Sequence, residues 1–189
     1  MGRIVLTEFI SVDGVVEAPG GEDFKYPDWS FAFDRGPEAE RFKELEALGS
    51  AALLLGRTTY EGFAQAWPGR TDEQGYAERM NGMPKHVVSS TLQAAEWNNT
   101  TIVCGNLAEE VGRLKEQPGQ DILVFGSGVL VNGLLARGLV DRFTLLIYPL
   151  ALGSGQRLFA DGSAAKLTLV ESKAFGSGVV ACVYDVAKG

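Results

Sequence analysis

The stretch Leu53-Leu54-Leu55-Gly56-Arg57-Thr58-Thr59-Tyr60-Glu61-Gly62-Phe63 decides how the rest of the chain is interpreted. A short apolar run ends in a glycine, and a basic residue, two threonines and a helical pattern follow it. This order predicts a strand, a tight turn and the N-terminus of a helix. Thr58 and Glu61 stand at the spacing of a capping box, in which the threonine caps the helix and the glutamate reaches back to the threonine amide.

Such a helix start suits an anion, because its first backbone N–H groups have no partners within the helix and the helix dipole is positive there. Arg57 adds a full positive charge beside it. We predict that the phosphates of a dinucleotide bind at this turn. An ordinary strand-to-helix junction with a surface arginine is the alternative, which this stretch alone leaves open.

The composition is that of one globular domain, residues 1–189, with 46% hydrophobic and 22% charged residues. The formal net charge of -7 opposes binding to nucleic acid or to anionic membranes, because both depend on clustered Lys and Arg. The N-terminus carries no signal-peptide pattern, and no apolar run is long enough to span a bilayer. We therefore expect a cytoplasmic protein that binds neither nucleic acid nor membranes.

The residues that usually hold metals are scarce. His86 is the single histidine, and neither a Cys-x-x-Cys nor a His-Glu-x-x-His motif occurs. This pattern excludes a structural zinc site and disfavours a Ser-His-Asp hydrolase, so no metal is expected. Cys104 and Cys182 lie in separate apolar runs, which predicts free and buried thiols.

Strand-like and helix-like segments alternate through the middle of the chain. Strands are predicted at residues 3–11, 51–55, 85–88, 100–104, 121–125 and 142–148, and helices at 37–48, 58–67, 106–115 and 129–137. Two further strands, at 166–175 and 179–186, are joined by a Gly-Ser-Gly turn. This order predicts an α/β fold with a mostly parallel twisted sheet, helices on both faces and an antiparallel C-terminal edge pair.

The helix that begins at Pro37 shows an amphipathic pattern. We expect Lys43 and Glu46 to lie mostly in solvent, and the core-facing side to consist of Ala39, Phe42, Leu45 and Leu48. The segment before it, residues 17–36, contains many aromatic residues without periodicity. It is predicted to be a loop folded over something apolar, either a ligand pocket or the core itself.

In an open parallel sheet, ligands bind outside the carboxyl ends of the strands. Three predicted strands end in small or hydroxyl residues: Gly56-Arg57-Thr58-Thr59, Ser89-Ser90 and Gly126-Ser127-Gly128. Glycine lets the backbone approach a ligand, and Ser and Thr offer hydrogen-bond groups without bulk. The third glycine of the dinucleotide fingerprint and any Gly-Lys-Ser/Thr are absent, which disfavours a standard Rossmann domain and excludes a P-loop NTPase.

Taken in order, Gly56-Arg57-Thr58-Thr59-Tyr60-Glu61, His86-Val87-Val88-Ser89-Ser90 and Val124-Phe125-Gly126-Ser127-Gly128 resemble the three NADPH-binding segments of the dihydrofolate reductase fold. The closer likeness is to the reductase domain of the riboflavin-biosynthesis deaminase–reductase and its stand-alone bacterial relatives. These typically carry Ser-x-Asp-Gly, here Ser11-Val12-Asp13-Gly14, and a loop like Leu152-Gly153-Ser154-Gly155-Gln156-Arg157-Leu158-Phe159. The resemblance covers essentially the whole chain, and the deaminase motif is absent.

The resemblance implies an NADPH site. Arg57 would bind the 2′-phosphate bidentately, and Ser89 and Ser90 would lie beside the adenosine ribose phosphate. The implied cofactor-binding residues are Gly56, Arg57, Thr58, Thr59, Ser89, Ser90, Gly126, Ser127, Gly128, Val129 and Leu130. Dihydrofolate reductases have Gly-Gly with a cis bond where this chain has Gly126-Ser127, so the conformation of that bond stays open.

Four residues are candidates for the substrate end. Asp13 and Glu40 are candidate catalytic carboxylates, although Asp13 suits an ordinary turn and Glu40, like Glu38, suits the first turn of a helix. Trp29 and Arg157 are candidate substrate contacts. Arg157 would recognise a sugar phosphate, or else lie on a surface loop.

The implied reaction is that of 5-amino-6-(5-phosphoribosylamino)uracil reductase, in which a ribose is opened to a ribityl chain. Dihydrofolate reduction is the alternative within the enzyme class, and a non-catalytic nucleotide-binding or ligand-binding protein is the alternative outside it. The partners expected from the resemblance are a small heterocyclic substrate and a second copy of the chain, because the riboflavin reductases pair through their sheets.

Overall fold

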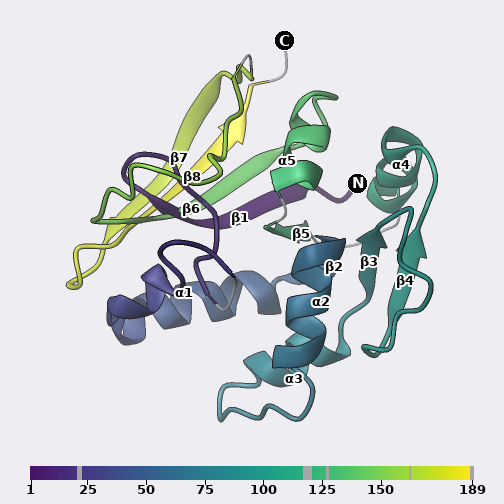
Figure 1. Ribbon diagram of the computed structural model, residues 1–189, viewed down its shortest axis with the longest axis horizontal. Coiled ribbons are helices and arrows are strands. Elements are labelled where there is room, and N and C mark those ends of the chain that lie inside the picture. The colour runs from purple at the N-terminus through teal and green to yellow at the C-terminus, as the bar shows by residue number, and fades with distance from the viewer. Residues whose placement is uncertain (21–22, 117–120, 127, 162, 188–189) are drawn as a thin grey trace.

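The computed structural model describes residues 1–20, 23–116, 121–126, 128–161 and 163–187. Within them, one sheet runs through the molecule in the strand order β4-β3-β2-β5-β1-β6-β8-β7 (Figure 1). Its strands are β1 (Ile4–Ser11), β2 (Ser50–Gly56), β3 (Lys85–Val88), β4 (Thr100–Val103), β5 (Asp121–Phe125), β6 (Arg142–Tyr148), β7 (Leu167–Ala174) and β8 (Val180–Val186). Neighbours from β4 to β6 are parallel, whereas β8 and β7 are antiparallel additions, so the predicted sheet is confirmed.

Helices cover both faces of this sheet (Figure 1). On one face lie α1 (Gly36–Leu48), α2 (Arg57–Ala66) and α3 (Tyr76–Gly82), and on the other α4 (Leu107–Glu116) and α5 (Gly128–Leu135). A short 3-10 helix, Trp29–Ala32, precedes α1. Leu53 packs in the cluster with α2 and α3, and Leu54 in the cluster with α4 and α5. Because both faces of β2 are covered, its sequence is apolar without alternation.

The turn after β2 forms where it was predicted, but its cap differs. Gly56 is the N-cap residue of α2, and no side chain hydrogen-bonds to the cap. The helix begins at Arg57, two residues earlier than a Thr58 cap requires, so the predicted capping box is wrong. Glu61 instead lies one helical turn from Arg57, with its Oε1 3.9 Å from the Arg57 Nε. The first amides of α2 are therefore left without a side-chain cap.

The inward face of α1 also differs from the predicted one. Ala39, Lys43 and Ala47 are buried, whereas Leu45 and Leu48 are 53% and 38% exposed. The two alanines let the helix lie close to the sheet, and the long side chain that points inward between them is charged. The prediction that Lys43 lies in solvent and the two leucines in the core was wrong, because a polar partner on the sheet holds the lysine.

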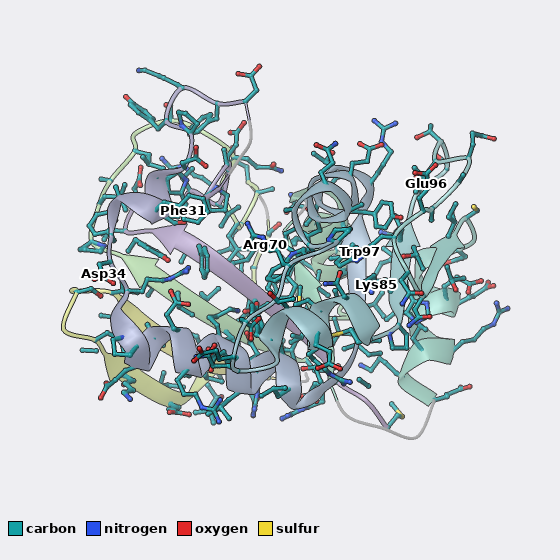
Figure 2. All side chains as sticks on the ribbon, turned by 90° about the horizontal axis from the view of Figure 1, so that it is seen from below. Phe31, Asp34, Arg70, Lys85, Glu96 and Trp97 are labelled. Atoms are coloured by element: carbon teal, nitrogen blue, oxygen red, sulfur yellow. The ribbon has the colours of Figure 1, made fainter. Side chains whose placement is uncertain are left out.

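A second buried lysine joins α3 to the sheet. The Lys85 ammonium is fully buried, lies 4.2 Å from the centre of the Trp97 ring, and donates to the carbonyl oxygens of Asn81, Met83 and Asn98 at 2.8, 2.9 and 3.0 Å (Figure 2). All three ammonium protons are thus matched by acceptors. These carbonyls belong to the end of α3 and to the segment before β4, so one side chain ties three segments together.

Replacing Lys85 by Met should destabilise the fold by about 3 kcal/mol, because three buried carbonyl oxygens lose their donor and the ring loses its cation. Urea denaturation of the wild type and the variant measures this difference. The matched control is Lys166→Met, which removes an exposed lysine and should change the free energy of unfolding by less than about 0.5 kcal/mol. Equal effects of the two substitutions would contradict the assigned role.

Candidate functional site

The carboxyl ends of β3, β2 and β5 lie side by side, because these strands are parallel neighbours. Two contacts join the segments that follow them. Arg57 donates from Nη1 to the Oγ1 of Thr91 at 3.1 Å. The Oγ1 of Thr59 lies so near Gly126 that a Cβ on that residue would be 2.9 Å away from it. The three predicted cofactor-binding segments therefore meet at one edge of the sheet.

Position 126 has two constraints that only glycine meets. Its φ is +53°, in the left-handed region, and a side chain would collide with Thr59. Gly128 begins α5, and a Cβ there would lie 1.8 Å from the Nε2 of Gln156. Bare backbone at both positions is what close approach of a ligand requires. Ser127 lies outside the described residues, so its predicted role and the conformation of its peptide bond stay predictions.

The remaining predicted cofactor residues divide by exposure. Thr58, Ser90 and Val129 are exposed, whereas Thr59, Ser89 and Leu130 are buried.

Two of these side chains already have structural partners. The Oγ of Ser89 accepts hydrogen bonds from the backbone N–H groups of Thr91 and Leu92 at 3.2 and 3.0 Å, so it shapes the turn after β3. Leu130 packs in the core under α5. Arg57, by contrast, is half-exposed and keeps guanidinium N–H groups available for a phosphate.

Asp13 holds two loops together. Its carboxylate accepts hydrogen bonds from the Ser11 hydroxyl at 2.6 Å and from the amides of Leu152 and Gly153 at 3.1 and 2.8 Å. These hydrogen bonds lower the pKa of Asp13 to about 2, and the bond from the Ser11 hydroxyl has the largest effect. The carboxyl is therefore ionised at neutral pH and carries no proton to donate. Arg157 donates to the carbonyl oxygen of Asp13 at 2.7 Å, and its side chain remains 56% exposed.

Glu40 is connected to the strand ends through Arg35. The Nε and Nη2 of Arg35 donate to the Oε1 of Glu40 at 3.2 and 3.0 Å, and its Nη1 donates to the Tyr148 hydroxyl at 3.3 Å. The guanidinium also lies over the Phe9 ring, 4.8 Å from its centre. The Glu40 side chain is 55% exposed, so it acts on this edge of the sheet by way of the arginine.

Trp29 lies in the core. It is 4% exposed, its Nε1 donates to the carbonyl oxygen of Glu17 at 2.7 Å, and its ring packs edge-on against Tyr148. Trp29 therefore exposes little surface with which it could make the predicted contact with a substrate. Phe31 of the same loop is 65% exposed (Figure 2).

Sequence reasoning missed a buried charged cluster. The Nζ of Lys43 donates to the Oγ1 of Thr7 and, at 2.5 Å, to the Oε2 of Glu46, and Thr7 donates to the same carboxylate oxygen at 2.8 Å. The Lys43 and Glu46 side chains are 8% and 12% exposed. We call these three residues the Lys43 cluster. Thr7 was the available signal, because a polar residue inside the apolar run of β1 needs a buried partner.

Aromatic rings surround the Lys43 cluster. Phe125 is the register partner of Thr7 on β5, and its ring centre lies 5.0 Å from the Nζ of Lys43. The Phe9 ring lies 5.8 Å from the same atom, and Phe63 of α2 packs edge-on against Phe125. All three rings are half-buried. The cluster therefore lies beside the end of β5, which Gly126 follows, and the rings offer planar apolar surfaces beside its paired charges.

Two surface hollows of about 430 Å³ each lie elsewhere, one between α2 and residues 92–97 and one between α1 and Gln74. Neither is lined by Gly56, Ser89 or Gly126. We place the candidate site at the strand ends, because there the glycine turns, the free amides of α2 and the Lys43 cluster meet.

Among the residues that the structure describes, no group of three or more His, Cys, Asp or Glu side chains could hold a metal ion. Both cysteines are free: Cys182 is buried, but Cys104 is exposed. The prediction of a buried thiol was wrong for Cys104, because it follows β4, which is the edge strand of the sheet. No helix in the described part of the chain is long and apolar enough to cross a membrane.

Asp13→Ala should loosen residues 150–158, because the amides of Leu152 and Gly153 lose their acceptor. Hydrogen exchange at these two amides should accelerate in the variant at pH 7. The folded pKa, about 2, lies below the ordinary value of 3.8. The stabilising contribution of Asp13 is therefore fully present above pH 3.8 and is lost as the pH falls through 2. Asp161→Ala, at an exposed aspartate of the following segment, is the control, and equal exchange in all three proteins would refute the assignment.

Comparison with known proteins places this geometry in a family. Residues 3–181 match the family described as the RibD C-terminal domain. The uncharacterized protein YyaP of Bacillus subtilis (strain 168) is 31% identical over 186 residues, which cover 96% of this chain and 94% of YyaP. The uncharacterized protein YwjB of the same organism is 25% identical over 178 residues, 94% of each chain.

Solved structures share the fold at lower identity. A putative riboflavin biosynthesis protein from Shewanella sp. PV-4 matches with a TM-score of 0.78 and 17% identity, over 98% of this chain and 99% of that one. A pyrimidine reductase-like protein from Corynebacterium diphtheriae matches with a TM-score of 0.64 and 13% identity, over 100% and 93%. RibD of Acinetobacter baumannii matches with a TM-score of 0.71 and 16% identity, over 99% of this chain and 58% of RibD. These likenesses confirm the predicted fold, and the match of residues 3–181 shows that the chain belongs to the RibD C-terminal domain family.

Proposed function

We propose that the protein is an NADPH-dependent reductase of a small flat heterocycle, with a reaction like that of 5-amino-6-(5-phosphoribosylamino)uracil reductase. The observation that carries the proposal is the meeting of three strand ends, poor in side-chain bulk, in a chain of the RibD C-terminal domain family. The names of the Shewanella and Corynebacterium structures, a putative riboflavin biosynthesis protein and a pyrimidine reductase-like protein, agree with it.

The residues at the strand ends fit a phosphorylated dinucleotide. The uncapped amides of α2 face the phosphates, with Arg57 beside them for the 2′-phosphate. Gly126, held in a left-handed conformation against Thr59, gives the cofactor close access to the backbone. The cofactor would supply the hydride, while the protein orients it and the substrate and sets the electrostatics around them.

The substrate lies, in this proposal, on the β1 side of Gly126. The half-buried rings of Phe9 and Phe125 offer apolar surfaces for a flat ring there. Arg35 lies over the Phe9 ring and adds positive charge, and the exposed Arg157 remains a candidate contact for a sugar phosphate. We further propose that the protein acts in the cytoplasm as a homodimer joined through the sheet, whose edge strand β7 has Leu169 and Val170 about half exposed.

Mixing the purified protein with NADPH and each candidate substrate tests the proposed reaction. We expect the cofactor absorbance to fall with the ribosylamino-pyrimidine and to stay constant with dihydrofolate. Oxidation with dihydrofolate instead would favour a dihydrofolate reductase. Saturable NADPH binding without oxidation by either compound would favour the non-catalytic binding protein, and no NADPH binding would refute the proposal.

Arg57→Ala should weaken NADPH binding by about tenfold to a hundredfold, because a charge-assisted bond to the 2′-phosphate is lost. NADH lacks that phosphate, so its affinity should change by less than about threefold. Calorimetric titration of both cofactors gives the two ratios. The control is Arg113→Ala, which removes an exposed arginine of α4 and should leave both unchanged. An equal loss for NADPH and NADH would contradict the role of Arg57.

A further inference from the structure

The Lys43 cluster is unusual because it is charged, buried and closed upon itself. Lys43 donates to Thr7 and Glu46, and Thr7 donates to Glu46, so the three residues form a triangle. Placing two charges this far from water costs free energy that apolar residues of the same size would not require. A buried ion pair is therefore weak support for the fold, and its position calls for another explanation.

The hydrogen-bonding groups of the triangle are not all used. An ammonium has three donors, and within the described residues Lys43 makes hydrogen bonds to two acceptors. The Oε1 of Glu46 is buried and has no hydrogen-bond partner among the described residues. One donor and one acceptor therefore remain next to each other. A buried polar atom without a partner loses its hydration without compensation, unless a ligand supplies what is missing.

The position of the triangle relates it to the cofactor turn. Thr7 and Phe125 are partners in the β1–β5 register, and Gly126 follows Phe125. The Phe125 and Phe9 rings lie 5.0 and 5.8 Å from the Lys43 ammonium. The Lys43 ammonium is thus set among half-buried aromatic rings, and one of these rings belongs to the residue before the Gly126 turn.

The charges around the triangle select the kind of ligand. A phosphate would be repelled by Glu46, and an ammonium ligand by Lys43. A neutral ring with a carbonyl oxygen beside a ring N–H satisfies both, because its oxygen accepts from Lys43 and its N–H donates to Glu46.

We propose that Lys43 and Glu46 form a substrate-binding pair that recognises the lactam edge, a carbonyl next to an N–H, of a planar heterocycle, with Thr7 as the residue that positions them. The inference rests on the proposed function in one respect, that the substrate ring lies on the β1 side of Gly126. It assigns the recognition of the ring to α1 and β1, and leaves the phosphates to α2 and the exposed arginines.

Two fluorescent probes that differ by one methyl group test the pair. The parent ring is 1-methylpteridine-2,4-dione, which presents carbonyls beside N3–H, its only N–H. The methylated ring is its 1,3-dimethyl derivative, which keeps the ring and the carbonyls but has no N–H. Titration of the wild type, with NADP⁺ present, should show the parent ring binding at least about tenfold more tightly than the methylated one. If the parent ring does not bind, or if the two bind equally, the inference is overturned without any variant.

Substitutions then assign the discrimination to residues. Glu46→Gln should weaken binding of the parent ring by about tenfold and bring the ratio of the two probes toward one. Thr7→Ser keeps the hydroxyl and should keep the ratio. Glu38→Gln is the matched control, because Glu38 lies on the same helix, is 67% exposed and pairs with Lys173 on the surface. If folded Glu46→Gln keeps the wild-type ratio of the two probe affinities, the Lys43 cluster is only a structural ion pair.

NADPH affinity separates this inference from the proposed function. It should be the same in the wild type and in all three variants, because none of these residues lies at the α2 turn. If the wild type does not bind NADPH, the proposed function fails, and the probe ratio measured without cofactor still decides the inference. If NADPH binds normally and the probes are not distinguished, only the inference fails.

Discussion

The parallel hydrogen bonding of β2, β5 and β1 is the constraint on which the rest of the site depends. It aligns Leu55 and Thr7 with Phe125 on either side, so β2 and β5 end at the same level, beside Thr7 in the middle of β1. Because parallel strands present their carboxyl ends at one edge, every segment that follows them meets there (Figure 1). The turn at Gly56, the turn at Gly126 and the Lys43 cluster are neighbours for this single reason.

The sequence was sufficient for those parts of the fold that local patterns control. The apolar run Leu53–Leu55 specifies a strand covered on both faces, and Gly56 specifies where it ends. The alternation of strands and helices then restricts the sheet to a mostly parallel one. The cap of α2 was predicted wrongly because Thr58 and Glu61 satisfy the capping-box spacing, while Gly56 caps the helix two residues earlier without a side chain.

The substrate end was less predictable, because its contacts join residues far apart in the chain. Lys43 is held by Thr7, and the carboxylate of Asp13 is held by the amides of Leu152 and Gly153. The residue spacing within α1 does not reveal that a lysine and two alanines form its inward face. A helical pattern assigns Leu45 and Leu48 to that face instead, because they are apolar. The partner on the strand decides, and it belongs to another part of the chain.

The distribution of charge over the site follows from what each end would have to bind. The chain carries a net charge of -7, so a phosphorylated ligand must be held by local positive groups, and these belong at the hydrated edge where Arg57 is half exposed. A neutral ring needs the opposite environment, because hydrogen bonds discriminate between rings best where water is excluded. A buried lysine and glutamate together supply donor and acceptor without adding net charge, whereas either one alone would leave an uncompensated charge under the rings.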